Sequence, residues 1–213
     1  MNQTAFPISE EAPGKRFLLG HLLPIRRFSV AEYHEMGEVG ILSEDERVEL
    51  IEGVIIEMSP IGSKHAATVK KLNRIFSNRL SLNEAIIGVQ DPVFLDDGTE
   101  PQPDISILKP RDDEYADEHP GTFDVLLIIE VADTSIEDDR DVKLPRYAAA
   151  GIPEVWIVNI PEKKIEAYRI PVGEKDDAGY RVRVEYREDD TLTPEAFPDV
   201  DIVVAGVLPK SSK

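Results

Sequence analysis

Three acidic residues and one lysine have the types and the order along the chain that metal-dependent chemistry needs. Glu130 lies inside the apolar run FDVLLIIEVA (123–132), and Asp104 directly follows a proline in the segment PQPD. A buried ionised carboxylate is costly unless it is paired or binds a metal ion. Glu130 therefore needs a specific partner. Glu49, in an earlier strand-like segment, and Lys143, on the polar segment after Glu130, complete the candidate set.

The order of these residues suits a shared ion. An acidic loop separates Asp104 from Glu130, and two adjacent strands joined by that loop would bring both acids to one edge of a sheet. Two or three oxygen ligands there suit Mg²⁺ or Mn²⁺, which retain water for substrate oxygens. Such an ion lowers the pKa of a bound water and neutralises charge on a phosphate. Lys143 could orient that water or stabilise the transition state as a point charge.

Each of these residues also has a simpler interpretation. Glu130 could pair with a lysine or arginine, or lie at the end of its strand. Asp104 could cap the start of a strand after proline, and Lys143 could be a solvated helix residue. The apolar sequence around Glu130 favours the metal-binding interpretation, because a solvated acid has no reason to stand there.

The first half of the chain supplies elements that could position these residues. Residues 28–40 predict a short helix with Ser29 as its N-cap. Alternating apolar residues predict a hairpin over 47–60 with its turn at Glu52-Gly53. The apolar stripe over 63–83 predicts a helix. The predicted core positions of this helix are Val69, Leu72, Phe76 and Leu80. Strands are expected at 85–95 and 104–109.

The second half predicts a strand–helix–strand unit. The run 123–132 is typical of a central strand covered on both faces. A helix is expected over 138–150, although Pro145 should kink it or mark a late start. A strand over 154–160 could lie parallel to the first, as strands joined by a helical crossover do. Further strands are expected at 164–170 and 180–188. The fold class is α/β, with a mixed sheet flanked by helices.

The totals place limits on the protein class. The 213 residues suggest one domain over 28–208, with an N-terminal extension at 1–27 and a tail at 209–213. The chain has no cysteine, which excludes disulfides and cysteine nucleophiles and favours the cytoplasm. No run reaches the ~20 apolar residues of a membrane span. A net charge of −18 argues against a large DNA-binding surface.

Basic residues are concentrated in one segment, SKHAATVKKLNRIFSNRL (63–80), which contains no acid. Lys70, Lys71 and Arg74 fall largely outside the apolar stripe of the predicted helix, so they are candidates for contacts with nucleic-acid phosphates. His65 opens this helix and could contact phosphate or assist the acids. It could equally be an ordinary polar residue at a helix N-terminus.

Other polar residues receive weaker predictions. Gln90 could point toward the same sheet edge as Asp104, or be solvated. Tyr147 shares a helix face with Lys143 and is expected to pack rather than react. His21, His34 and His119 show no ligand spacing in the sequence and receive no function.

The segments PQPDISIL and LLIIEVADTSIEDDRDVKLPRYAAAGIPEVWIVN resemble the PD-(D/E)XK nuclease superfamily, and within it the Uma-type group of restriction endonuclease-like proteins. RVELIEGVIIEMSPIGSKHA is similar to the opening hairpin and helix of that group. The resemblance covers roughly residues 28–205. It implies a restriction endonuclease-like core and metal-dependent hydrolysis of phosphodiester bonds.

The resemblance also implies roles for individual residues. Asp104 matches the acid of the Pro-Asp motif, Glu130 the second acid, and Glu49 an additional acid near the start of the fold. The superfamily places a lysine two residues after the second acid, where this chain has Ala132. Lys143, on the following helix, is the expected replacement.

Three functions remain open from the sequence. The first is a Mg²⁺- or Mn²⁺-dependent DNA endonuclease, a fold that can dimerise to cut both strands. The second is a catalytically inactive binding or regulatory module with the same fold, which the net charge and the displaced lysine favour. The third is a phosphoesterase acting on a small substrate. Retention of all three acids favours the first.

Overall fold

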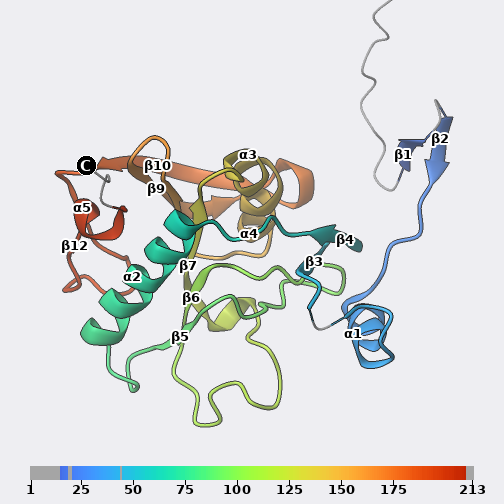
Figure 1. Ribbon diagram of the computed structural model, residues 1–213, viewed down its shortest axis with the longest axis horizontal. Helices are drawn as coiled ribbons and strands as arrows, with labels where there is room; N and C mark the ends of the chain where they lie inside the picture. Colours follow the sequence, from blue (N-terminus) through green and yellow to red (C-terminus); the bar gives the residue numbers. More distant parts are fainter. Residues whose placement is uncertain (1–14, 19–20, 44, 210–213) are drawn as a thin grey trace, which may run out of the picture.

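The computed structural model describes residues 15–18, 21–43 and 45–209, and its centre is a six-stranded mixed sheet (Figure 1). The strands are, in spatial order, β10 (Gly179–Arg187), β9 (Lys164–Val172), β8 (Glu154–Asn159), β7 (Val125–Ala132), β6 (Ile105–Leu108) and β5 (Ile86–Gly88). Neighbouring strands are antiparallel except β7 and β8, which are parallel. The predicted α/β class and the predicted parallel pair are both confirmed.

Helices cover both faces of this sheet. On one face lie α2 (Ser63–Arg79) and α5 (Val204–Val207), which share a core with alternate residues of β6, β7 and β8. On the other face lie α3 (Ile136–Asp138), the π-helical turn η2 (Asp139–Lys143) and α4 (Leu144–Ala149), which share a second core with the intervening residues of β7 and β8. Strand β7 is buried at nearly every position because it is covered on both sides.

The apolar stripe predicted for α2 is confirmed. Its four residues Val69, Leu72, Phe76 and Leu80 are all buried, and the Phe76 ring lies 6.1 Å from that of Trp156 on β8. The helix ends at Arg79, four residues earlier than the sequence suggested, because Leu80 adopts an extended conformation.

The N-terminal elements form a separate group beside the main sheet (Figure 1). Helix α1 (Val30–Glu38) begins at Ser29, whose side chain accepts a hydrogen bond from the Glu32 amide in a capping box, as expected. The predicted hairpin consists of β3 (Val48–Ile51) and β4 (Val54–Glu57). Its turn residues Glu52 and Gly53 both have positive φ, which suits a tight hairpin turn.

Short strand pairs lie at both ends of the chain. Strands β1 (Lys15–Leu18) and β2 (His21–Pro24) pair with each other outside the main sheet. Residues 1–14 and 19–20 of the expected extension over 1–27 lie outside the described residues, as do residues 210–213 of the expected tail. Near the C-terminus, β11 (Thr191–Leu192) pairs with β12 (Ile202–Val203), which leads into α5.

Two predicted elements differ from the structure. The expected strand over 85–95 is only β5, because Gln90 has φ 59° and turns the chain. The expected helix over 138–150 starts earlier and contains the π-helical turn η2, where the Leu144 amide bonds to the Asp139 carbonyl five residues back. Pro145 then lies at the second residue of α4, directly after the π-helical turn.

A buried charge cluster on β9 connects the sheet to the helical layer above it. The carboxylate of Glu166 accepts hydrogen bonds from Arg140 of η2, from Arg183 at 3.1 Å and from the Tyr168 hydroxyl at 2.7 Å. Burial raises the pKa of Glu166, but the hydrogen bonds from Arg140 and Tyr168 outweigh that effect and lower the pKa to about 2. The ionised carboxylate therefore stabilises the fold.

We expect Glu166→Gln to lower the free energy of unfolding by about 3–5 kcal/mol at neutral pH, the usual cost of breaking a buried ion pair. Because the folded pKa lies below the ordinary 4.5, this stabilisation exists above pH 4.5 and is lost as pH falls toward 2. Urea unfolding at successive pH values should therefore show the two proteins converging in acid. The control Glu188→Gln, an exposed partner of Lys163, should cost less than about 1 kcal/mol. A difference that stays constant with pH would attribute the effect to packing instead.

Candidate active site

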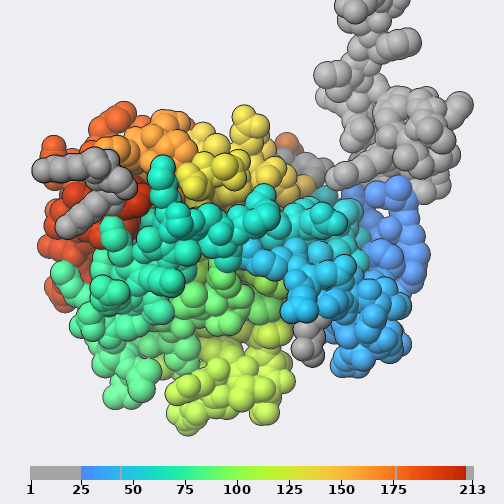
Figure 2. Space-filling model, viewed as in Figure 1, coloured from blue at the N-terminus to red at the C-terminus, as the bar shows by residue number. Residues whose placement is uncertain are grey.

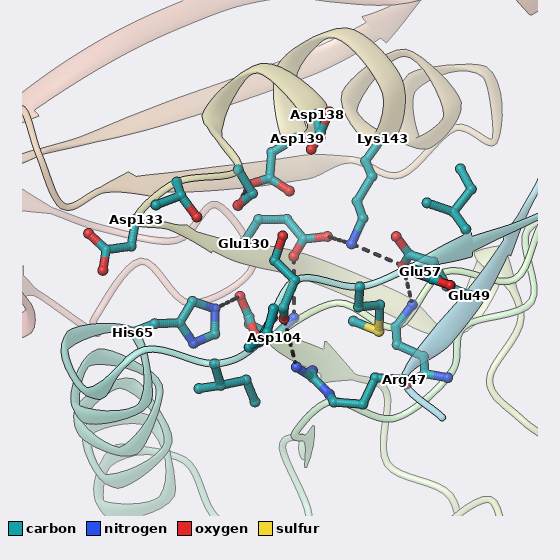
Figure 3. A pocket seen from close by; sticks show the side chains of 18 of the residues that line it. Arg47, Glu49, Glu57, His65, Asp104, Glu130, Asp133, Asp138, Asp139 and Lys143 are labelled. Carbon is teal, nitrogen blue, oxygen red and sulfur yellow. Dashed lines mark hydrogen bonds and ion pairs between the residues drawn. The ribbon is translucent and has the colours of Figure 1, made fainter. Parts of the chain in front are cut away.

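The two motif acids lie opposite each other at the end of neighbouring strands. In the antiparallel pair of β6 and β7, Ile105 lies opposite Ile129. Asp104, one residue before, and Glu130, one residue after, are therefore facing positions, and their side chains lie on one face of the sheet. The amide of Asp104 donates to Glu130 Oε2 at 3.4 Å, and Figure 3 shows both carboxylates in the same pocket. The expected arrangement of these two acids is confirmed.

Three donors fix the Asp104 carboxylate. The Val131 amide donates to Oδ2 at 2.9 Å, and Gln90 Nε2 donates to Oδ1 at 3.0 Å. Nε2 of His65, at the first turn of α2, lies 2.9 Å from Oδ2. His65 and Gln90 thus both reach the site, which the sequence left undecided. Within the described part of the chain, His65 Nδ1 is buried and has no hydrogen-bond partner.

Glu130 is the most completely enclosed of the acids. Its side chain is 4% exposed, and the Tyr147 hydroxyl donates to Oε1 at 2.6 Å. Burial raises the pKa of Glu130 well above its ordinary range, although the Lys143 ammonium opposes that shift. The carboxylates of Asp139 and Asp104 raise the pKa further. Addition of a cation near these acids would therefore be strongly favourable.

Lys143 reaches the acids from the π-helical turn. Its Nζ lies 3.0 Å from Glu49 Oε2 and 3.4 Å from Glu130 Oε1. Burial by itself would lower the pKa of Lys143, but the carboxylates of Glu130 and Glu49 outweigh that effect and raise it. The ammonium therefore stays charged inside the pocket (Figure 3).

Glu49 completes the set from a different sheet. It lies on β3, is buried, and accepts a hydrogen bond from the Gln102 amide at 3.1 Å. The hairpin β3–β4 thus contributes its acid to the pocket formed by the main sheet, as expected for the additional acid.

The displaced lysine has a structural explanation. Ala132 lies on the same face of β7 as Glu130, two residues further on, where the superfamily has its lysine. Here Ala132 is fully buried in the core shared with Leu144 and Tyr147. Because α4 covers this position, a lysine there would be buried among apolar groups, and Lys143 supplies the cation from above.

Sequence reasoning missed two participants. Asp139 is buried beside Lys143 and accepts a hydrogen bond from the Ser135 hydroxyl at 2.9 Å; burial raises its pKa. Tyr147 was expected only to pack, yet its hydroxyl binds Glu130. Both signals were in the sequence: Asp139 and Tyr147 each lie four residues from Lys143, the spacing that places side chains on one helix face.

The pocket has a volume of about 270 Å³ and is strongly acidic. It lies between the ends of β6 and β7, the hairpin β3–β4, the start of α2 and the turn η2 (Figure 3). Its charged or ionisable lining residues are Arg47, Glu49, Glu57, His65, Asp104, Glu130, Asp133, Asp138, Asp139 and Lys143. Acidic residues outnumber basic ones, so an anionic substrate requires an added cation here.

The basic residues of α2 differ in their exposure to solvent. Lys70 and Arg74 are exposed, whereas Lys71 is half-buried and donates to the Leu208 carbonyl. The N-terminus of α2 borders the pocket through His65. In Figure 2 the outer side of α2, in teal, lies at the surface.

Two histidines that received no function from the sequence lie close together in the structure. His34 and His119, which received no function because of their distance in the sequence, meet at the buried Glu100. The tertiary fold brings them together, and no local pattern could have indicated it. His21 lies on β2, and His65 belongs to the acidic pocket.

Comparison with known proteins defines the class and then the family. A crystal structure described as a putative nuclease of the DUF820 family from Anabaena variabilis matches with a TM-score of 0.60 and 18% identity, over 84% of this chain and 97% of that one. This likeness shows that the two chains share a fold. The model of the Uma2 family, described as putative restriction endonucleases, matches residues 30–205. The chain belongs to the Uma2 family.

No curated protein sequence matches the chain. Across the described residues, no helix has the length and apolar character required to cross a membrane.

The enclosure of Glu130 predicts a measurable cost when its tyrosine partner is lost. We expect Tyr147→Phe to reduce the free energy of unfolding by about 1–3 kcal/mol, the cost of leaving a buried polar group without its hydrogen-bond partner. Urea unfolding followed by Trp156 fluorescence would measure it. Tyr186→Phe, which removes a hydroxyl outside the pocket, should stay within about 0.5 kcal/mol of the parent protein. Equal effects in the two variants would contradict a specific role for Tyr147.

Proposed function

We propose that this protein is a metal-dependent endonuclease that hydrolyses phosphodiester bonds in DNA. The observation that carries the proposal is the convergence of Asp104, Glu130 and Glu49 with the ammonium of Lys143 in one buried pocket. Membership of the Uma2 family supports the same activity.

The donor set of this pocket fits Mg²⁺ or Mn²⁺. All ligand candidates are carboxylate oxygens, the type that these ions prefer. Among the described residues the three acids do not form a compact ready-made cage, since Lys143 lies between Glu49 and Glu130. Asp104 and Glu130 are therefore the principal candidates, because Mg²⁺ commonly takes one or two carboxylates and keeps the rest of its shell as water. A bound ion would supply charge neutralisation at the phosphate and a more acidic water.

The protein residues have distinct proposed roles. Lys143 places a positive charge beside the acids, where it can stabilise charge that develops on the phosphate. His65, Gln90 and the Val131 amide orient the Asp104 carboxylate, and Tyr147 orients that of Glu130.

The net charge of −18 limits how DNA can bind. An acidic pocket repels phosphate until a cation is present, so affinity must come from the ion and from basic residues beside the pocket. We propose that Lys70 and Arg74 on α2, with His65 at its start, supply that contact, and that Lys71 contributes less because it binds the Leu208 carbonyl.

The proposal extends to the domain, the oligomeric state and the cellular compartment. Residues 28–208 would act as one domain, and a homodimer would place two pockets to cut both strands. Absence of cysteine favours a reducing compartment such as the cytoplasm. The competing function is an inactive binding module, which the acidic surface favours because most of the chain repels DNA.

Cleavage of supercoiled plasmid in Mg²⁺ or Mn²⁺ tests the activity. Glu130→Gln and Asp104→Asn preserve side-chain shape while removing a charge that the ion needs, so each should slow cleavage on the order of 100-fold or more. The exposed Glu174→Gln serves as the matched control and should cleave at the parent rate. Thermal unfolding would verify that each variant is folded.

The outcomes separate the two functions. If the parent protein leaves plasmid intact with both ions, the inactive module is favoured. If Glu130→Gln and Asp104→Asn cleave as fast as the parent, the activity belongs to a contaminant or to another site.

The basic helix gives an independent prediction. Lys70→Gln combined with Arg74→Gln should weaken binding to a short DNA duplex and reduce the log–log salt slope by about 2, at about 0.9 per phosphate contact. Fluorescence anisotropy across a range of KCl concentrations would measure it, in a Glu130→Gln background that prevents cleavage. Lys175→Gln combined with Arg181→Gln removes the same charge elsewhere and should change the slope less. Identical slopes in both pairs would exclude a specific role for α2.

A further inference from the structure

A second cluster of metal-ligating side chains lies outside the acidic pocket. His34 of α1, Glu100 in the segment before β6, and His119 in the loop 110–122 bring their ligating atoms within 4.8 Å of one another. His34 Nε2 lies 2.7 Å from Glu100 Oε1, and the rings of His34 and His119 are 6.0 Å apart in an edge-on arrangement. None of these residues lines the acidic pocket.

Backbone hydrogen bonds hold the segments that carry these three residues. In α1 the Val30 amide bonds to the Asp97 carbonyl at 2.7 Å. The Glu100 amide bonds to the Leu50 carbonyl of β3 at 2.8 Å, and Glu100 is 2% exposed. His119 precedes Pro120, whose carbonyl accepts a hydrogen bond from Phe94 at 2.9 Å. Segments far apart in the sequence are thus held with their ligating groups converging.

We propose that His34, Glu100 and His119 form a second metal site, selective for a borderline transition ion such as Zn²⁺. Two imidazoles and one carboxylate suit Zn²⁺ and not Mg²⁺, which takes oxygen ligands. Ligands of a tetrahedral ion with bonds of about 2.1 Å lie about 3.4 Å apart. His34 Nε2 and Glu100 Oε1 are 2.7 Å apart, and all three ligating atoms lie within 4.8 Å of one another, so small side-chain movements complete the site.

The surroundings leave room for the rest of the coordination shell. The cluster borders a cavity of about 610 Å³ whose acidic lining residues include Asp117, Glu118 and Asp124. His34 is 43% exposed at its side chain, so an ion can enter from solvent, while the buried Glu100 supplies the fixed negative ligand. A water or one of the neighbouring acids can complete four-coordination.

An ion pair between His34 and Glu100 accounts for the arrangement less fully than a metal site does. A protonated His34 would satisfy Glu100 as an ion pair, yet His119 lies beside both and adds a second imidazole. Two imidazoles and a carboxylate converging at one point form a ligand set for a transition ion. Metal binding uses all three groups together.

Such an ion would connect α1, the segment before β6 and the loop 110–122. Glu100 is hydrogen-bonded through its backbone to Leu50, the neighbour of Glu49 in β3. The segment that carries Glu100 therefore lies beside the strand that delivers Glu49 to the acidic pocket. We assign it a structural role, in which the ion holds α1 and the loop against this strand.

The test measures metal binding without reference to nuclease activity. Full-length protein freed of metal by chelator is titrated with Zn²⁺ in excess Mg²⁺, and bound zinc is quantified by mass spectrometry and calorimetry. We expect one zinc equivalent that Mg²⁺ does not displace. His34→Gln and His119→Gln should each weaken binding at least about 100-fold through loss of a direct ligand, and Glu35→Gln, an exposed acid on α1, should bind as the parent does.

Two further measurements separate this site from the acidic pocket. Asp104→Asn, which alters only that pocket, should retain the zinc equivalent. Zinc should raise the thermal midpoint of the parent and of Asp104→Asn but not of His119→Gln, because only a ligand of the folded state stabilises it. Side-chain nitrogen NMR should show zinc shifting the His34 and His119 imidazoles and not that of His65.

The contrary results are equally specific. Unchanged zinc binding in His119→Gln, loss of zinc in Asp104→Asn, or no Mg²⁺-resistant zinc in the parent would each overturn the proposal. None of these results depends on whether the protein cleaves DNA.

Discussion

The pocket depends on one buried interaction, the ammonium of Lys143 held between the carboxylates of Glu49 and Glu130. Charges removed from water are costly unless they are paired with good geometry. Here three elements must meet for that pairing to exist: the hairpin supplies Glu49, the central strand supplies Glu130, and the π-helical turn supplies Lys143. The same interaction that neutralises the acids also forces the hairpin to dock on the main sheet.

Much of this arrangement could be predicted from the sequence because it is local. The apolar setting of Glu130, the proline before Asp104 and the stripe of α2 follow from periodicity and burial cost. The opposite placement of Asp104 and Glu130 needed only that their strands be adjacent. The spacing of Asp139 and Tyr147 from Lys143 indicates a shared helix face. Their contacts in the pocket could not be predicted, because those contacts depend on how this helical segment docks on the sheet. The meeting of His34 with His119 is wholly tertiary, since the residues lie on segments that no pattern relates.

The acidity of the chain and its proposed substrate are physically compatible. Repulsion of phosphate by a site rich in carboxylates disappears when a divalent ion occupies it, so substrate affinity becomes conditional on the ion. A protein with few basic contacts would then bind DNA weakly and briefly. On the proposed function, low affinity for bulk DNA and dependence on a metal would both follow from the same charge distribution.

The π-helical turn has an implication for how this site could arise or be lost. A π turn contains one more residue than the α-helical turn it replaces. Removal of a single residue between Asp139 and Lys143 would convert this turn to a regular α-helical turn and change which of its side chains face the pocket. One of the two side chains would then leave the pocket while the apolar face of α4 stayed packed on the sheet. A deletion of one codon would thus remove the proposed chemistry and leave the fold in place.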